Sequence, residues 1–264
     1  MPAVSVIVAA RDAAATLPRT LAALADQVVE GGHEVVVVDD RSRDATAAIA
    51  RAAGLGPVLA AGAAGPAAAR NTGAAAARAP ALAFTDADCF PAAGWLAAGM
   101  RALGRHDLVQ GAVAPDPTVG PGPFDRSLWV GADRGMYQTA NLFIRRDAFE
   151  RIGGFESWLG PATGKELGED VLLGWSARRA GARAGFAPDA LVHHAVHRRG
   201  AGGFVAERLR LRYLPALVAR IPELRGEAFF LGVFLTPRSA AFDLALAGLG
   251  AAAARRRPAP LVAG

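Results

Sequence analysis

Short apolar runs alternate with helix-like segments through the first third of the chain. The apolar runs predict strands over residues 4–9, 34–38, 57–59 and 81–84. Helices are predicted between them, over residues 16–29, from Ser42 or Asp44 to 53, and over 66–77. This alternation predicts an α/β fold of the single Rossmann-like type, with a mostly parallel sheet covered by helices on both faces. The loops that follow the strands then meet at the carboxyl edge of the sheet.

The order of elements loosens after residue 88. Helices are predicted over residues 95–103, 146–152 and 170–180, and strands over 108–113 and 142–144. A Pro/Gly-rich loop at 115–123 and a glycine-containing loop at 156–168 separate them. Glycines end two of these helices, at Gly153 and Gly181.

Composition limits the number of domains and the compartment. The chain has 264 residues, 52% of them hydrophobic, which is enough for one large core or for one core plus a small appendage. We expect a main domain over residues 1–200 and a helical, basic and apolar C-terminal region over 201–264. The single cysteine, Cys89, excludes an internal disulfide, and residues 1–10 show no secretory signal. Together these features predict a cytoplasmic protein.

Basic charge gathers near the end of the chain. The net charge is +5, and residues 200–264 alone carry nine arginines against four acidic residues. These arginines are not interleaved with the aromatic side chains on which single-stranded nucleic acids stack, and no DNA-reading motif is present, so no nucleic-acid partner is expected. The Gly-x-Gly-x-x-Gly fingerprint does not follow the first strand, which argues against an NAD or FAD enzyme.

The C-terminal region contains two apolar stretches, at residues 228–235 and 240–254. Neither reaches the roughly 20 apolar residues that a bilayer span needs. Three consecutive arginines, 255–257, follow the second stretch and suit the anionic inner leaflet of a cell membrane. Two interpretations stay open: the region attaches to a membrane surface, or it forms an amphipathic helix packed on the rest of the protein.

Pairs of acidic residues stand at three predicted element ends. Asp86 and Asp88 follow the fourth strand, where two carboxylates could hold a divalent cation that carries a diphosphate; the alternative is a solvated turn. Asp39-Asp40 follows the second strand and could simply cap the next helix. Glu169-Asp170 begins a predicted helix, where acidic residues also complement the helix dipole.

Taken in order, these clusters resemble family 2 of the inverting, nucleotide-diphospho-sugar-dependent glycosyltransferases with the GT-A fold. The resemblance covers roughly residues 3–200 and depends on order and spacing. The matching segments are Val4-Ser5-Val6-Ile7-Val8 with Arg11-Asp12, Val37-Val38-Asp39-Asp40 with Asp44, Ala69-Arg70-Asn71-Thr72-Gly73, Asp86-Ala87-Asp88, Gly153-Gly154-Phe155 and Gly168-Glu169-Asp170.

The resemblance implies a nucleoside site at the amino-terminal loops. Residues Ala9, Ala10, Arg11 and Asp12 would hold the nucleoside, and Asp40 would accept a hydrogen bond from the base. Arg70 would face the diphosphate or the base, although a surface arginine at a helix start is the alternative. The family often has Asp-Gly-Ser where this chain has Asp40-Arg41-Ser42, so the identity of the nucleotide stays open.

The resemblance also implies a divalent metal, Mg or Mn. Asp86 matches the position that contacts the ribose or the metal, and Asp88 matches the metal ligand proper. A bound cation would stabilise the charge that grows on the leaving diphosphate. His194 resembles the histidine that completes the metal shell, but His193 and His197 lie close by in sequence, and each of the three could be an ordinary half-exposed histidine.

The general base implied by the resemblance is Asp170, which would take the proton from the acceptor hydroxyl. Glu169 would position the acceptor or the loop. Residues 139–141, including Asn141, and residues 158–164 would line the side of the donor sugar and acceptor. Trp158 would stack on a sugar ring or, as the alternative, be a buried structural residue.

We therefore expect a metal-dependent inverting glycosyltransferase that moves a sugar from a nucleoside-diphosphate sugar to a hydroxyl of a glycan, glycolipid or small molecule. The basic, apolar tail favours a lipid-linked or cell-envelope glycan and a place at the inner face of the membrane. Two alternatives remain. A sugar nucleotidyltransferase would want a Gly-rich phosphate loop near the amino terminus, which is missing. A noncatalytic nucleotide-sugar binding module would leave Glu169-Asp170 as a helix cap.

Overall fold

The computed structural model describes residues 1–158, 167–233 and 237–255. It divides the chain into two compact units, residues 1–213 and residues 214–264. The sequence placed the boundary between residues 200 and 201, thirteen residues earlier. The helical segment that follows residue 200 thus belongs to the first unit, together with the sheet.

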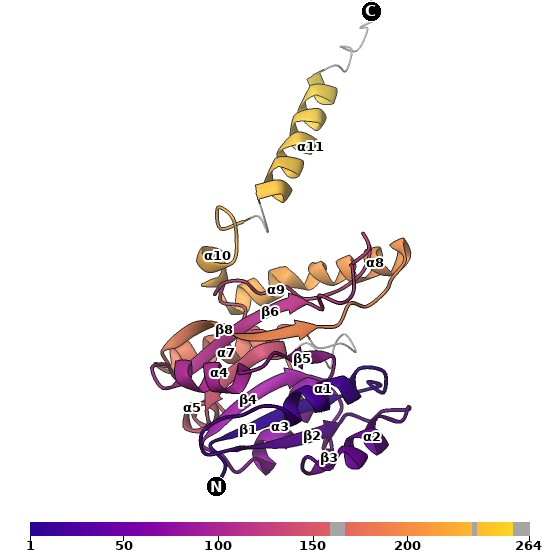
Figure 1. The fold of residues 1–264 in the computed structure, drawn as a ribbon. Helices are drawn as coiled ribbons and strands as arrows, with labels where there is room; N and C mark the ends of the chain where they lie inside the picture. The colour runs from indigo at the N-terminus through magenta and orange to yellow at the C-terminus, as the bar shows by residue number, and fades with distance from the viewer. Residues whose placement is uncertain (159–166, 234–236, 256–264) are drawn as a thin grey trace, which may run out of the picture. The chain divides into compact units, whose positions relative to one another are not determined.

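A single eight-stranded sheet runs through the described part of the first unit (Figure 1). The order of its strands is β3-β2-β1-β4-β7-β6-β8-β5. Neighbours from β3 to β4 are parallel, as are β6 and β8, whereas β7 is antiparallel to both of its neighbours and β5 is antiparallel to β8. The strands are β1 (Val4–Ala10), β2 (His33–Asp39), β3 (Val58–Ala60), β4 (Ala81–Asp86), β5 (Cys89–Pro91), β6 (Leu108–Pro115), β7 (Leu142–Arg145) and β8 (Ala184–His194).

Helices cover both faces of this sheet. The first unit contains α1 (Leu17–Ala25), α2 (Thr46–Ala53), α3 (Pro66–Ala76), α4 (Trp95–Leu103), α5 (Arg146–Arg151), α7 (Glu169–Arg179) and α8 (Ala201–Arg208), with short 3-10 segments η1 (Thr139–Asn141) and η2 (Leu209–Tyr213). The apolar faces of α1, α2 and α4 pack against alternate residues of the strands in one buried cluster. Helix α3 packs on the opposite face, against β1 and β2. The α/β fold predicted from the sequence is confirmed.

The period of two along β1 shows why both faces need a cover. Val4, Val6 and Val8 face the cluster that includes the leucines of α1, because successive side chains of a strand point to opposite faces. Ile7 faces the other way, toward α3. A Cβ atom on Gly73 would lie 2.5 Å from Cγ2 of Ile7, so α3 can approach the sheet this closely only with a glycine at that position.

The parallel register brings the predicted acidic residues to one edge. Ala9 of β1 aligns with Asp86 at the end of β4, and Ala10 aligns with Asp39 at the end of β2. The loops that follow these strands therefore start at the same level of the sheet. This places residues 9–12, 40 and 86–88 at the common carboxyl edge, as expected for an open parallel sheet.

Two features of the sheet were missing from the sequence prediction. The three-residue strand β5 follows Asp88 directly, and β8 extends over eleven residues although only residues 190–192 form an apolar run. Pro188 and Asp189 interrupt the apolar pattern of β8 where the pairing with β6 shifts its register. A prediction from the apolar pattern alone therefore makes this strand too short.

The second unit is helical where it is described. It contains α9 (Leu214–Arg220), α10 (Leu224–Glu227) and α11 (Pro237–Arg255). None of the helices in the described ranges is both long and apolar enough to cross a bilayer. Leu244 and Leu246 on α11 are exposed. Arg256 and Arg257 of the predicted basic run lie outside the described residues.

Candidate active site

Two adjoining cavities open at the carboxyl edge of the sheet. The smaller one has a volume of about 280 Å³ and the larger one about 500 Å³. They share five lining residues, which mark the passage between them: Pro66, Arg70, Asp86, Arg126 and His194. The two cavities therefore form one continuous site with two ends.

The smaller cavity collects most of the residues that the sequence assigned to a nucleoside and a metal. Its lining includes Ala9, Arg11, Asp12, Asp86 and Asp88. The loop that follows β1 is held in place by the loop that follows β2. The N–H of Asp12 donates to Ser42 Oγ at 3.0 Å, and Asp12 Oδ1 accepts from the N–H of Arg43 at 2.7 Å. Asp12 adopts φ of 48°, an uncommon left-handed conformation that these contacts support.

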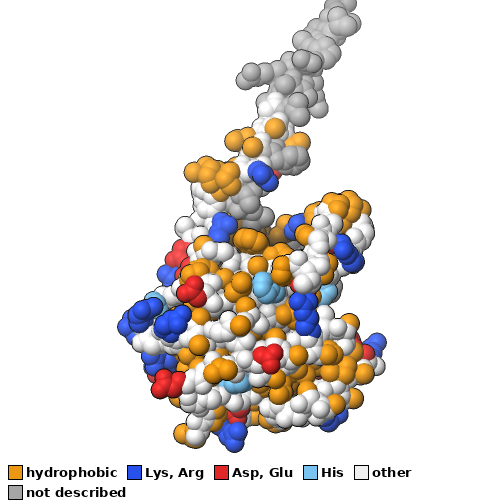
Figure 2. All heavy atoms as spheres, viewed as in Figure 1, with side chains coloured by type: hydrophobic (Ala, Val, Ile, Leu, Met, Phe, Trp, Pro, Cys, Tyr) orange, Lys and Arg blue, Asp and Glu red, His pale blue; other side chains and the backbone are white. Residues whose placement is uncertain are grey.

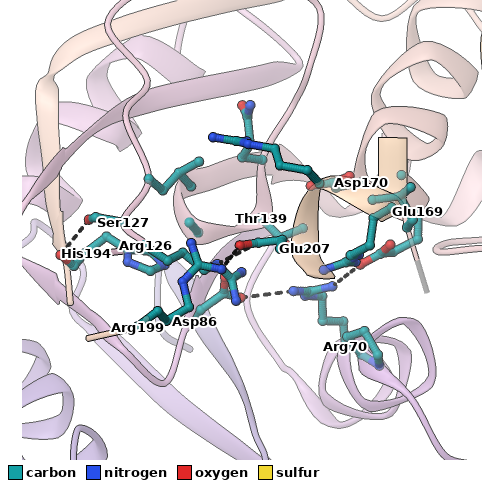
Figure 3. Close-up of a pocket in the computed structure, with 18 of the residues that line it drawn as sticks. Arg70, Asp86, Arg126, Ser127, Thr139, Glu169, Asp170, His194, Arg199 and Glu207 are labelled. Atoms are coloured by element: carbon teal, nitrogen blue, oxygen red, sulfur yellow. Dashed lines mark hydrogen bonds and ion pairs between the residues drawn. The ribbon is translucent and has the colours of Figure 1, made fainter. Parts of the chain in front are cut away.

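Arg70 links the two acidic clusters inside the site (Figure 3). Its Nη1 donates to Oε1 of Glu169 at 3.0 Å, and its Nη2 donates to Oδ1 of Asp86 at 2.9 Å. Burial works against the guanidinium charge, but the two carboxylates raise the pKa of Arg70 above its ordinary value. The arginine is thus a fixed positive charge between the end of β4 and the start of α7.

Asp170 lies at the first turn of α7, beside Glu169, and lines the larger cavity. Gly168 takes φ of 75° and lets the chain turn into the helix there. Burial, followed by the negative charge of Glu169, raises the pKa of Asp170 to about 7, although Arg70 and the N–H of Val171, 2.8 Å from Oδ1, act in the opposite direction. A carboxyl group with this pKa can exchange a proton near neutral pH.

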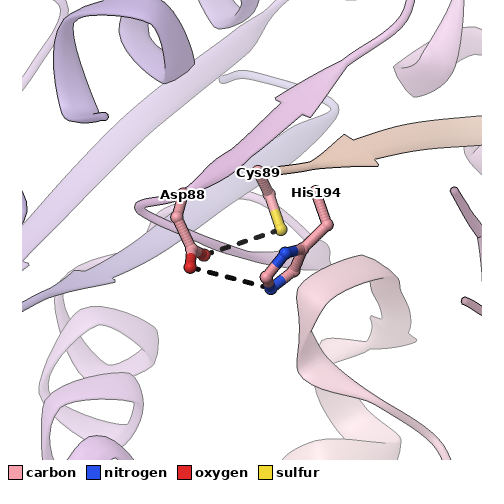
Figure 4. A group of neighbouring side chains, drawn as sticks. All are labelled: Asp88, Cys89 and His194. Atoms are coloured by element: carbon pink, nitrogen blue, oxygen red, sulfur yellow. Dashed lines mark hydrogen bonds and ion pairs between the residues drawn. The ribbon is translucent and has the colours of Figure 1, made fainter. Parts of the chain in front are cut away.

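Asp88 lies close to His194, His197 and Cys89, and Figure 4 shows it with His194 and Cys89. Its Oδ2 is 2.7 Å from Nε2 of His197 and 3.6 Å from Nε2 of His194. Burial opposes ionisation, but the hydrogen bond from His197 and the nearby charges of His194 and Arg126 hold the pKa of Asp88 below its ordinary value. Burial raises the pKa of the Cys89 thiol well above its usual value, so this group stays a neutral thiol.

The ring of His194 has a defined orientation. Its Nδ1 lies 2.7 Å from the carbonyl oxygen of Ala195, which can only accept a hydrogen bond. In the neutral ring Nδ1 therefore carries the proton, and the lone pair of Nε2 faces Asp88. His193 precedes it in β8, opposite Phe90 of β5 in the strand register, so its side chain points to the other face of the sheet. The structure thus brings His194 and His197, rather than His193, to Asp88.

The described lining of both cavities lacks four residues that the sequence assigned to the site: Ala10, Asp40, Asn141 and Trp158. Ala10 is buried in β1. Both carboxylate oxygens of Asp40 accept from the N–H of Gly65, at 3.2 and 3.1 Å, which fixes the turn before α3; Nη1 of Arg11 lies 3.7 Å from its Oδ2.

The side-chain amide of Asn141 lies in the interior of the protein and not at the surface of either cavity. Its Oδ1 accepts from Nε1 of Trp95 at 2.8 Å, and its Nδ2 donates to the carbonyls of Ala112 and Ala190, each at 2.7 Å. The side chain has no exposed surface and joins α4, β6 and β8. Its neighbours Thr139 and Ala140 line the larger cavity instead.

The sequence also assigned residues 158–164 to the side of the donor sugar and acceptor. Trp158 is half-buried, between the exposed and the structural alternatives expected for it. Residues 159–164, which the sequence also assigned to the acceptor side, lie outside the described residues.

The larger cavity contains charged residues that the sequence did not single out: Arg126, Arg199, Glu207, Arg208 and Arg210. Glu207 of α8 is an anchor for two of them, since its Oε1 lies 3.3 Å from Nε of Arg126 and its Oε2 pairs with Nη1 of Arg199. Arg199 lies two positions after His197, so its closeness in sequence to the candidate metal ligands could have marked it as a site residue. Arg126 lies in a loop with no pattern, and nothing in the sequence marks it.

Comparison with known proteins gives a consistent result. The family model described as glycosyl transferase family 2 matches residues 5–155. Glycosyltransferase AglE of Haloferax volcanii is 31% identical over 210 residues, which cover 74% of this chain and 67% of that protein. The pre-mycofactocin glycosyltransferase of Mycobacterium tuberculosis is 34% identical over 149 residues, but these cover 49% of this chain and only 30% of that protein.

Solved structures share the fold at low sequence identity. The mannosyltransferase PcManGT from Pyrobaculum calidifontis, solved with GDP-Man and Mn2+, aligns with a TM-score of 0.64 and 22% identity over 97% of this chain and 81% of its own. S. aureus TarS 1-349, solved with UDP-GlcNAc, aligns with a TM-score of 0.60 and 20% identity over 76% of this chain and 60% of its own. The fold is therefore the GT-A fold, and the chain belongs to glycosyl transferase family 2.

Proposed function

We propose that this glycosyltransferase moves a sugar from a nucleoside-diphosphate sugar to an acceptor hydroxyl, with inversion at the anomeric carbon and with the help of a divalent metal. The observation that carries the proposal is the passage between the two cavities, where Arg70 bridges Asp86 and Glu169. In this proposal the smaller cavity holds the donor and the larger cavity holds the acceptor. The two meet beside the ion pairs that Arg70 forms with Asp86 and Glu169. The donors bound in the solved structures of PcManGT and TarS, GDP-Man and UDP-GlcNAc, support a nucleotide-sugar donor.

The residues around Asp88 fit Mg or Mn. One carboxylate oxygen and the imidazole Nε2 of His194 face each other, and Asp86 lines the same cavity. Carboxylate and imidazole ligands suit Mn, whereas the neutral thiol of Cys89 suits neither metal. Asp88 and His194 would hold the cation, with Asp86 beside them. When bound, it would supply Lewis-acid stabilisation for the leaving diphosphate.

Several residues of the smaller cavity are held in positions that suit binding of a nucleotide. We assign the nucleoside to the loop of Ala9, Arg11 and Asp12, which is pinned to residues 42 and 43. Asp40 would act less directly, by fixing the turn at Gly65 and pairing with Arg11. Arg70 adds a buried positive charge beside the place where negative charge develops during bond breaking.

Asp170 is the proposed general base. Its carboxylate would take the proton of the acceptor hydroxyl while the oxygen attacks the anomeric carbon from the face opposite the diphosphate, which inverts the configuration. A pKa of about 7 makes its ionised form both available and basic enough near neutral pH. Glu169 would hold Arg70 and the start of α7 in position for this step.

We further propose a lipid-linked or cell-envelope glycan as the acceptor and attachment at the inner face of the membrane. Exposed apolar residues of α8 and η2, Val205, Leu209 and Leu211, alternate with Arg208 and Arg210, which line the larger cavity. Figure 2 shows apolar atoms gathered at the surface over α8. A basic and apolar surface of this kind suits a lipid carrier with an anionic head group. The basic C-terminal region would add to the attachment.

A panel of labelled UDP- and GDP-sugars, incubated with the protein in Mn, Mg or EDTA, tests the proposal. We expect transfer to an added acceptor, or slow donor hydrolysis, with one donor class and with metal only. Equal turnover in EDTA would contradict the metal assignment. Conversion of the nucleotide sugar and added pyrophosphate to a nucleoside triphosphate and a sugar 1-phosphate, without release of nucleoside diphosphate, would indicate a nucleotidyltransferase and overturn the proposed reaction. Retained anomeric configuration in the product would overturn the assignment of a single base.

A further inference from the structure

A third hollow adjoins the active site and is not used by the proposed reaction. It has a volume of about 470 Å³, within the range of about 300–1,000 Å³ typical of small-molecule sites. Its lining residues are Gln110, Trp129, Val130, Gly131, Ala132, Arg134, Met136, Tyr137 and Gln138. Gln138 also lines the larger active-site cavity, so the two spaces adjoin there.

Trp129 presents a fixed aromatic surface to this hollow. Its side chain is 73% exposed, which is unusual for the largest apolar residue. The next residue, Val130, is buried and exchanges both backbone hydrogen bonds with Val113 of β6, at 2.8 and 3.0 Å. A Cβ atom on Gly131 would lie 3.0 Å from Nε1 of Trp129, so the indole lies close against the backbone of Gly131. The ring is therefore anchored at its base and open on its face.

Gln110 forms a buried, fixed part of the wall of the hollow. The residue is 2% exposed, and its Nε2 donates to the carbonyls of Gly111, Asn141 and Gln138, at 3.0, 2.8 and 3.4 Å. Because all three partners can only accept, the orientation of the amide is fixed. Its Oε1 is buried and has no hydrogen-bond partner among the described residues. This oxygen is also closed to solvent, so Gln110 bounds the hollow and presents no acceptor to a ligand inside it.

A sugar ring suits an exposed indole beside a hollow of this size. One face of a pyranose carries C–H groups that pack on an aromatic ring, and its hydroxyl edge can stay in contact with solvent. We infer that the hollow of Trp129 and Gln110 is an acceptor subsite for a sugar residue one or more units away from the reacting hydroxyl. This inference rests on the proposed function and deepens it: the glycan acceptor contacts the protein at Trp129 through a second sugar residue, besides the one that reacts.

The test compares Trp129→Ala with Trp129→Phe and with Val28→Ala, a control that truncates an exposed apolar side chain outside the three cavities. The probes are methyl glycosides of glucose, mannose, galactose and N-acetylglucosamine and the matching di- and trisaccharides. Binding to the full chain is measured by saturation-transfer NMR and calorimetry. Because Trp129 is exposed, its replacement should not disturb folding, which circular dichroism checks.

We expect a di- or trisaccharide to bind more tightly than its monosaccharide, and Trp129→Ala to weaken that binding at least about tenfold. Trp129→Phe should retain most of the affinity, and Val28→Ala all of it. Donor hydrolysis, with water as acceptor, should be unchanged in Trp129→Ala. Ala132→Phe, which fills the hollow, should also weaken binding without changing donor hydrolysis.

Unchanged glycan affinity in Trp129→Ala would overturn the subsite, and so would the absence of binding by every glycan of the panel to the wild type. An equal preference for mono- and trisaccharides would also count against it. These failures are separate from a failure of the proposed function, which would appear as absent donor hydrolysis in the wild-type protein.

Discussion

The guanidinium of Arg70 binds the carboxylate of Glu169, 99 positions away in the chain, at 3.0 Å in the interior of the protein. This pair ties the start of α3 to the start of α7. The same guanidinium reaches Asp86 at the end of β4. One side chain therefore holds together the three elements that carry the proposed donor, metal and base groups.

The first prediction concerns the pH dependence of transfer. The ionised form of Asp170 is the active one, and its pKa is about 7, so kcat/KM should rise with pH and level off above an apparent pKa near 7. Arg70 lowers that pKa, so Arg70→Met should move the rise to higher pH, whereas Arg70→Lys, which keeps the charge, should move it less. pH–rate profiles of the three proteins provide the measurement. A flat profile between pH 5 and 9 would contradict the base assignment.

The second prediction is that Asp170→Asn loses transfer and gains stability. Removal of the base should lower kcat by roughly 10²–10⁴-fold, while donor affinity stays near that of the wild type. Because the folded-state pKa lies above the ordinary value of 3.8, the charge destabilises the folded wild type increasingly as pH rises from about 4 to 7. The variant should therefore be more stable than the wild type, by on the order of 2 kcal/mol more at pH 8 than at pH 5.

Urea unfolding at the two pH values gives this difference. Asp147→Asn is the matched control, since Asp147 is exposed and lies outside the cavities. It should change neither turnover nor the pH dependence of stability. Full turnover in Asp170→Asn would remove Asp170 from the mechanism.

A third prediction separates the histidines. Asp88→Ala and His194→Ala should each remove the Mn-dependent part of donor binding, because they take away the facing oxygen and nitrogen ligands. His193→Ala is the matched control, since the same side chain is removed from the other face of β8. Calorimetry with UDP- or GDP-sugar, with and without Mn, measures the effect. If His193→Ala and His194→Ala weaken binding equally, the metal is elsewhere.

The fourth prediction is that Asn141 stabilises the fold and does not bind the donor. Asn141→Ala leaves the indole N–H of Trp95 and the carbonyls of Ala112 and Ala190 unpaired in the interior, and should cost roughly 2–5 kcal/mol of unfolding free energy. Measured below its melting temperature, the variant should bind the donor as the wild type does. A stable variant with weak donor binding would return Asn141 to the site.

The sequence predicted the parallel part of the sheet well, because the ends and spacing of the strands decide which residues meet at its carboxyl edge. Ala9 and Asp86 align in neighbouring strands, so any correct reading of the two strands places the loop and the acidic pair together. Because side chains alternate between the two faces of a strand, His193 and His194 must point to opposite faces of the sheet. This argument applies only once it is known that β8 includes both residues. A pattern broken by Pro188 and Asp189 does not reveal that extent.

Other parts of the site depend on contacts that no local pattern records. Arg126 enters the cavity from a loop and is paired with Glu207, 81 positions later. Asn141 has the residue type of a binding group, yet three hydrogen-bond partners brought together by the fold occupy its amide. Residue type suggests what a side chain can do, whereas its tertiary partners decide whether it is free to do it.

The glycine at position 73 links the apolar core to the charge pairing at the sheet edge. Helix α3 carries both Gly73, pressed against Ile7, and Arg70, one turn earlier. A single added methyl group there would push the helix outward and pull the guanidinium from its two carboxylates. Loss of reactivity can therefore originate in a hydrocarbon contact that no substrate touches.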